Sequence, residues 1–108
     1  MNENSVSQLN KVNKINDLCV DLILEEKIDE ALNKLQKAEL SLEKIINDSN
    51  KSIKNEIIIL ILHNIACCYQ KIKNFESCVT YLEAVIFHYD NMLKSKFSIP
   101  IDLNCILI

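Results

Sequence analysis

The sequence predicts an all-helical protein whose four helices pair into two antiparallel hairpins, stacked as a short solenoid. Three observations support this fold class. Apolar residues recur every three or four positions along four segments, which is the period of one helix face. The chain contains no glycine, and its one proline is Pro100. Because these residues are the strongest helix breakers, residues 1–99 can form long helices, and sheet folds with glycine-rich turns are not expected.

The first two predicted helices span residues 5–25 and 28–47. Polar residues separate the apolar positions of the first helix, which are Leu9, Val12, Ile15, Leu18, Cys19, Leu22 and Ile23. In the second helix, Asp29 and Glu30 lie in the first turn, where the helix dipole favours negative charge. The connection between the two helices is very short, so we expect them to pack antiparallel.

The last two predicted helices span residues 53–72 and 75–94, after a polar loop. Residues 57–62 are all apolar and rich in β-branched side chains, which also suits a buried strand. Helical spacing nevertheless continues to Ile72 without a breaker, so a helix buried on most sides is the better prediction. A second short connection, at Lys73 and Asn74, completes the second hairpin.

Length and charge limit the organisation and the partners of the chain. Its 108 residues allow one domain, which we expect to be a helical domain at 1–95 followed by a tail at 96–108. The net charge is −3, and all 12 positively charged residues are lysines that form no basic cluster. Proteins that bind nucleic acids usually gather lysine and arginine on one surface, so a nucleic-acid partner is not expected.

The cysteines and the N-terminal residues indicate a cytoplasmic protein. The five cysteines, at positions 19, 67, 68, 78 and 105, are odd in number and lack the spacing of a disulfide framework. The first ten residues lack the apolar core of a signal peptide. These two features indicate a reducing compartment. The longest apolar run, residues 57–62, is too short to span a bilayer, so a membrane partner is not expected.

The second half of the sequence repeats the first at an offset of 47 residues. In each half a small residue opens the second helix, Ala31 or Cys78, and a leucine comes four positions later. Small residues let helices approach closely, and large residues fill the space beside them. The predicted repeat core consists of Leu18, Leu22, Ala31, Leu35, Ala38, Ile65, Ala66, Tyr69, Phe75, Cys78, Leu82 and Val85.

The stretch from Asn64 to Val85 resembles a tetratricopeptide repeat. Ala66 occupies the small slot of the first helix, Tyr69 its aromatic slot, and Phe75 the aromatic slot at the turn. Residues 28–38 resemble the second helix of an earlier repeat. The resemblance covers about residues 10–93, and a generic pair of helical hairpins is the alternative.

The sequence departs from the family pattern in several ways. The family repeats at about 34 residues, whereas the offset here is 47, so the first repeat's second helix and its loop are extended. Tryptophan is absent, the closing proline is missing, and Glu26 and Lys73 stand where the family has a turn glycine.

The resemblance implies a protein-interaction module, an adaptor or scaffold without catalysis or cofactors. In such repeats the first helix of each hairpin lines a concave face, which suits an extended peptide or a helix. The implied groove residues are Asn13, Asn16, Val20, Ile23, Leu60, His63, Asn64, Cys67 and Gln70. Asn64 also matches one residue of a clamp for acidic tails of chaperones, but Asn16 and Val20 occupy the other clamp slots. The alternative role of Asn64 is a hydrogen bond between neighbouring helices.

Two hairpins are fewer than the three or more repeats that usually make a stable stack, so one apolar end face stays open. The alternative function is therefore a structural subunit or fragment of a larger assembly. It would dock or self-associate through the helix at 75–94 and the tail. This alternative predicts an exposed apolar patch formed by Phe87, Tyr89, Met92 and Phe97.

Two groups of residues invite a chemical interpretation. His63 and Cys67 would share a helix face, but no C-x-x-C pair accompanies them and Cys78 falls in a core position. We therefore expect neither a metal site nor a catalytic cysteine. Cys105–Ile108 has the form of a prenylation signal, although isoleucine is not a usual last residue. A lipid anchor at Cys105 is thus a lesser alternative to a tail that packs as an apolar strap over the open end.

Overall fold

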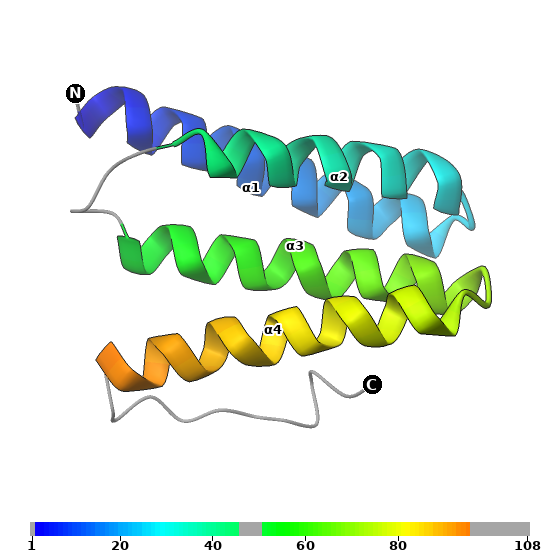
Figure 1. The fold of residues 1–108 in the computed structure, drawn as a ribbon. Helices are drawn as coiled ribbons and strands as arrows, with labels where there is room; N and C mark the ends of the chain where they lie inside the picture. The colour runs from blue at the N-terminus through cyan, green and yellow to red at the C-terminus, as the bar shows by residue number, and fades with distance from the viewer. Residues whose placement is uncertain (1, 46–50, 96–108) are drawn as a thin grey trace.

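The structure is a computed structural model that describes residues 2–45 and 51–95. It contains helices α1 (Asn2–Leu24), α2 (Ile28–Glu43), α3 (Lys51–Lys71) and α4 (Phe75–Ser95), as Figure 1 shows. The all-helical fold class is confirmed, including a helix rather than a strand at residues 57–62. The predicted tail, with Cys105 and the strap over the open end, lies outside the described residues.

The predicted end of the second helix is wrong, because α2 ends at Glu43. After that residue the backbone tightens, and the N–H groups of Lys44 and Ile45 donate to carbonyl groups three residues earlier, at 3.2 and 3.1 Å. Ile45 is nevertheless buried. The side chain of Ile45 fits the apolar period of the helix, although its backbone is no longer helical. The apolar period alone therefore places the end of the helix too late.

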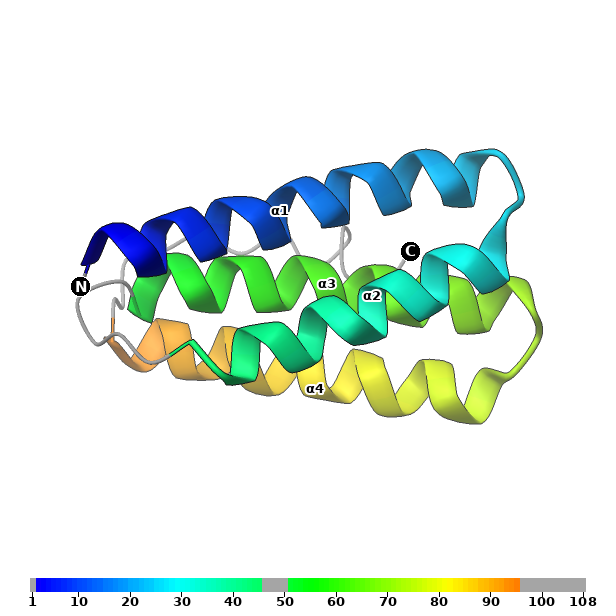
Figure 2. The ribbon, with the colours of Figure 1, turned by 90° about the horizontal axis from the view of Figure 1, so that it is seen from above.

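Helix α3 lies at the centre of the fold. It contacts all three other helices, whereas α2 packs mainly on α1 and α3, and α4 packs mainly on α3. Figure 1 shows α1 and α2 together at one edge, α3 below them and α4 at the opposite edge. Seen from above in Figure 2, α1 and α4 lie at opposite sides, with α2 and α3 between them. Of the apolar run in α3, only Leu60 is largely exposed. A helix with three neighbours needs apolar residues on most sides, which explains that run.

The segment Ser52–Lys71 of α3 is long and apolar enough to cross a membrane by length and composition alone. Core helices of soluble proteins meet the same criterion. In this fold the segment is partly buried against its three neighbours.

The two tight turns have the same backbone geometry, 47 residues apart. The N–H of Lys27 donates to the carbonyl of Leu22 at 2.8 Å, and the N–H of Asn74 donates to that of Tyr69 at 2.9 Å. Glu26 and Lys73 both have a φ of 66°. This is the Schellman ending of a helix, which normally places glycine at the left-handed position. Glu26 and Lys73 are the two positions at which the family pattern has its turn glycine, so the sequence located both turns correctly.

Most of the predicted repeat core is buried or half-buried, but two of its residues are not. Leu18 is 48% exposed and Phe75 is 59% exposed. Their counterparts at the 47-residue offset, Ile65 and Ile28, are buried in the main core cluster. Leu18 lies on the first helix and Phe75 on the last. The prediction fails at both because no further described hairpin covers the ends of the stack.

Candidate protein-binding surfaces

The face formed by α1 and α3 was the predicted peptide groove, and two of its residues are unavailable to a ligand. Ile23 is buried, and Asn16 is only 4% exposed. The amide Nδ2 of Asn64 donates to Oδ1 of Asn16 at 2.8 Å. The prediction of Asn16 and Ile23 as groove residues is therefore wrong, while the alternative role of Asn64 as a link between neighbouring helices is confirmed.

The other predicted groove residues remain accessible to different degrees. Asn13, Val20, Leu60 and Gln70 are exposed, and His63, Asn64 and Cys67 are half-buried. They present two apolar side chains, Val20 and Leu60, among polar ones. This surface can support a small contact, but the side chain of Asn16 is already hydrogen-bonded to Asn64 within the protein.

Three cysteines of the helices, Cys19, Cys67 and Cys68, have raised thiol pKa values. Burial raises the pKa of Cys68 to about 12, with smaller contributions from the neighbouring thiols of Cys67 and Cys19. Burial is also the largest cause of the raised pKa values of Cys67 and Cys19. The Cys19 thiol donates to the carbonyl of Ala31 at 3.6 Å. Because the thiolate is the reactive form, these thiols are poor nucleophiles at neutral pH.

The acidic, histidine and cysteine side chains that the structure describes form no group of three or more that could hold a metal ion. Cys78 is buried, as its place in the repeat core predicted.

A stripe of apolar residues runs along the outer side of α4. Phe75, Val79, Leu82 and Ile86 succeed one another at steps of three and four, so they share one helix face. Leu82 is half-buried, whereas Phe75, Val79 and Ile86 are 59%, 53% and 47% exposed. We call these four residues the α4 stripe. Within residues 2–45 and 51–95, no helix packs over it.

The residues of α2 that match the α4 stripe show what such a face looks like when it is covered. They are Ile28, Leu32, Leu35 and Glu39. Ile28 and Leu35 are buried and Leu32 packs beside them, in the cluster that also contains Ile61 and Ile65 of α3. Thus three of the four matched positions on α2 lie in the core that α1, α2 and α3 form together, and the fourth, Glu39, is half-buried.

The exposed patch expected near the end of α4 is only partly present. Phe87 is exposed and its ring makes an edge contact with His88, with centroids 5.6 Å apart. Tyr89 is half-buried, and Met92 is buried in the smaller core cluster, so the prediction of an exposed Met92 is wrong. Phe97 lies outside the described residues.

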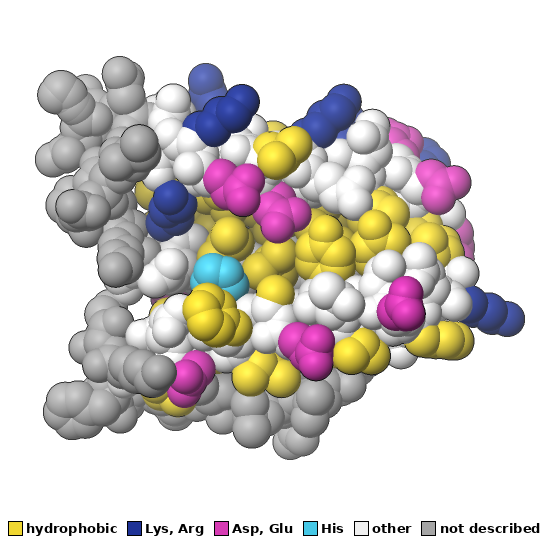
Figure 3. All heavy atoms as spheres, viewed as in Figure 1, with side chains coloured by type: hydrophobic (Ala, Val, Ile, Leu, Met, Phe, Trp, Pro, Cys, Tyr) yellow, Lys and Arg dark blue, Asp and Glu magenta, His cyan; other side chains and the backbone are white. Residues whose placement is uncertain are grey.

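A groove runs between α2 and α4, with α3 as its floor. Its volume is about 490 Å³. Figure 3 shows apolar side chains in this hollow, with acidic groups and a histidine around it. The lining residues, which define the α2/α4 groove, are Glu39, Glu43, Lys54, Asn55, Ile58, Leu62, Thr80, Tyr81, Ala84 and His88.

The charged side chains that line the α2/α4 groove are Glu39 and Glu43 of α2 and Lys54 of α3. Burial raises the pKa of Glu39, and the nearby Glu43 raises it further. Burial likewise raises the pKa of Tyr81, with Glu39 as the next cause. Burial lowers the pKa of His88, which favours its neutral form. The groove therefore carries negative charge on its α2 wall and a neutral imidazole on its α4 wall at neutral pH.

Three side chains beside the groove hold α2, α3 and α4 together. The amide of Gln36 donates to the hydroxyl of Tyr69 at 3.1 Å. The ring of Tyr69 stacks on that of Tyr81, with centroids 5.6 Å apart. One wall of the groove is thus tied to the other through α3, and the shape of the groove is set by packed aromatic rings.

Sequence reasoning missed the α2/α4 groove. The mixed glutamates and lysines of residues 25–44 have the pattern of a solvated helix face, which does not predict a groove. The available signal was the pair Glu39 and Glu43, like charges one helical turn apart, which an isolated helix would disfavour.

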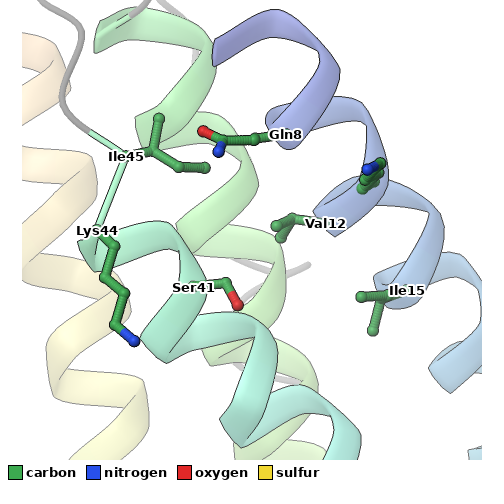
Figure 4. Close-up of a pocket in the computed structure, with 7 residues that line it drawn as sticks. Gln8, Val12, Ile15, Ser41, Lys44 and Ile45 are labelled. Atoms are coloured by element: carbon green, nitrogen blue, oxygen red, sulfur yellow. The ribbon is translucent and has the colours of Figure 1, made fainter. Parts of the chain in front are cut away.

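A second hollow, of about 330 Å³, lies between the start of α1 and the end of α2. Figure 4 shows Gln8, Val12 and Ile15 on one side and Ser41, Lys44 and Ile45 on the other. Lys11 completes the lining. This hollow is basic where the α2/α4 groove is acidic.

No family model matches the chain, and no curated protein or solved structure matches it either.

Proposed function

We propose that this chain is a tetratricopeptide-like interaction module, an adaptor or scaffold piece that binds another protein and carries out no reaction of its own. Two features support the repeat assignment. The turns at Glu26 and Lys73 share one geometry at the 47-residue offset. The helices contact one another in chain order, with an added contact between α1 and α3, as stacked hairpins do.

The observation that carries the proposal is the open α4 stripe. An exposed apolar face of this kind is a common mark of a protein-protein contact. The matched apolar residues of α2, Ile28, Leu32 and Leu35, already pack in the core that α1, α2 and α3 form. A partner helix at α4 would repeat an interaction that the molecule makes internally. In this proposal the adaptor and the subunit of a larger assembly use the same surface.

The face of α1 and α3 is the second candidate for the protein contact. Val20 and Leu60 lie exposed on it and would provide its apolar contacts. It ranks below the α4 stripe because its exposed apolar groups stand apart and Asn16 is already paired with Asn64.

The test is affinity capture from the native host with two matched double variants. Val79→Ser with Ile86→Ser removes the centre of the α4 stripe. Leu18→Ser with Leu40→Ser makes the same chemical change at exposed leucines of α1 and α2. We expect the control to retain the proteins captured by the wild type, and the stripe variant to lose at least one of them.

Two further measurements make this test decisive. Circular dichroism should show equal helix content in both variants, since all four residues are exposed. Sedimentation velocity of the purified wild type distinguishes self-association from a different partner. The proposal fails if the stripe variant retains every captured protein and the wild type is monomeric.

A further inference from the structure

The α2/α4 groove lies on another side of α4 from the stripe and combines features that the stripe lacks. Its floor is apolar, with Ile58 and Leu62 from α3 and Ala84 from α4. Its α2 wall carries Glu39 and Glu43, one helical turn apart. An apolar floor beside a negatively charged wall favours a ligand that presents apolar groups and a positive charge on the same face.

Among the described residues, neither Glu39 nor Glu43 forms a salt bridge. The one lysine that lines the groove, Lys54, donates from its Nζ to the carbonyl of Ile45 at 2.6 Å and keeps its positive charge, so the lining holds two carboxylates and one ammonium group. The ion pair that the structure shows lies elsewhere, between Lys27 and Glu25. The carboxylates of Glu39 and Glu43 lie close enough to repel each other, and a cation placed between them would relieve that repulsion.

We propose that the α2/α4 groove binds a helical segment of another protein, one that sets a lysine or arginine beside bulky apolar side chains. The cation lies against Glu39 and Glu43, and the apolar side chains enter over Ile58, Leu62 and Ala84. Binding of an amphipathic helix in an apolar groove is a common mode of peptide recognition. Complementary charge then gives the contact its specificity.

The dimensions of the groove agree with this occupant. On α4 its lining runs from Thr80 to His88, a rise of roughly 12 Å at about 1.5 Å per residue. That length accommodates about two turns of a partner helix, so two or three side chains from one face can enter. The neutral imidazole of His88 and the hydroxyl of Thr80 flank this length without adding positive charge.

Other classes of ligand suit the groove less well. An anion would meet the two carboxylates of α2. A metal ion would lack a set of ligands, because no group of three suitable side chains exists among the described residues. An uncharged apolar peptide would leave both carboxylates without a partner while covering them, which costs free energy.

The test uses a displayed library of random helical peptides, selected against the wild-type protein. We expect the enriched peptides to carry lysine or arginine within one turn of bulky apolar residues. A peptide from this set should bind Glu39→Gln with Glu43→Gln about tenfold more weakly, since two charge-assisted contacts are lost. The control, Glu76→Gln with Glu83→Gln, makes the same charge change on α4 outside the groove and should alter the affinity less than about twofold.

A second variant tests the apolar part of the site. Ala84→Phe fills the floor without changing any charge, and it should also weaken the peptide by about tenfold. Its helix content, measured by circular dichroism, shows whether the variant folds. If Ala84→Phe does not fold, Thr80→Trp blocks the groove from its rim and replaces it.

Three outcomes overturn the proposal. One is a selection that enriches no peptide, or peptides without positive charge. Another is equal affinity for the wild type and Glu39→Gln with Glu43→Gln. The third is a loss of binding with Val79→Ser and Ile86→Ser instead, which would place the peptides on the α4 stripe. This last result would refute the groove while supporting the proposed function.

Discussion

Helices α2 and α4 occupy equivalent places in the two hairpins, yet one is covered and the other is open. Each begins after a turn of the same geometry and packs a small residue against the helix before it, Ala31 in α2 and Cys78 in α4. On the next face, Leu35 is fully buried in the core formed by α1, α2 and α3, while Leu82 is only half-buried. The difference arises from the next helix in the chain, since α2 is succeeded by α3 and α4 by no described helix.

Similar local sequences in α2 and α4 thus have different energetic roles. An apolar side chain stabilises a fold in proportion to the area it removes from water. The same residue type in an exposed position therefore contributes little to folding. We expect substitutions at matched positions to separate these two roles.

The largest effect is expected for Leu35→Ala and its counterpart Leu82→Ala. The first creates a cavity in the main core and should lower the free energy of unfolding by about 3 kcal/mol. The second removes a half-exposed side chain and should cost about 1 kcal/mol. Urea unfolding followed by circular dichroism measures both. Equal costs for the two variants would show that α4 is covered in solution.

A smaller loss of stability is expected when the hydrogen bond between Asn64 of α3 and Asn16 of α1 is removed. Asn64→Ala leaves the buried Oδ1 of Asn16 without its 2.8 Å donor, which should cost about 1–3 kcal/mol. Asp17 is the exposed counterpart of Asn64 in the first hairpin, and Asp17→Ala should change stability by less than about 0.5 kcal/mol. A double-mutant cycle with Asn16→Ala measures the coupling, and a coupling of zero would contradict the link.

Exchanging the residue types at the N-caps of α2 and α4 should change stability in opposite directions. Asn74 Oδ1 accepts from the N–H of Ser77 at 3.2 Å, whereas the side chain of Lys27 caps nothing. Lys27→Asn should raise stability by about 1 kcal/mol, and Asn74→Lys should lower it by about the same amount. The exposed pair Lys27–Glu25, lost in the first variant, contributes little. Thermal unfolding of both variants gives the signs, and a loss in Lys27→Asn would refute the assignment.

A glycine at the left-handed position of either turn should raise stability by the same amount. Glu26→Gly and Lys73→Gly each replace a residue with a φ of 66°, and each should stabilise by about 0.5–1 kcal/mol after the entropy of glycine is counted. Glu26→Ala and Lys73→Ala are the controls, because alanine keeps the Cβ that causes the strain. A gain in only one of the two glycine variants would show that the turns differ in solution.

The smallest effect is expected at Glu39, whose counterpart on α4 is Ile86. Its pKa is raised in the fold, so its ionised form opposes folding once the pH exceeds the usual pKa of about 4.3. Glu39→Gln should therefore be slightly more stable than the wild type at pH 7, and this advantage should disappear as the pH falls below about 4. Chemical unfolding at both pH values measures it. A constant difference between wild type and variant would contradict the burial of this carboxylate.

Much of the fold could be predicted from the sequence, because the relevant signals are local. The apolar period placed the four helices, and the 47-residue offset placed both turns and the pairs of core residues such as Ala31 and Cys78. The candidate sites were harder. Asn16 had the polar character of a ligand-binding residue, but its amide is used within the protein.

The sequence by itself determined the helical elements, their turns and the faces that carry apolar residues, since backbone preference and periodicity act over a few residues. Only the tertiary structure decided which of those faces are covered. Leu18 and Phe75 lie open although their counterparts are buried, because burial depends on a neighbouring helix, and the described residues supply none over these two side chains. The α2/α4 groove likewise exists only because α3 separates two helices that are not adjacent in the chain, leaving Glu39 and Glu43 beside an apolar floor.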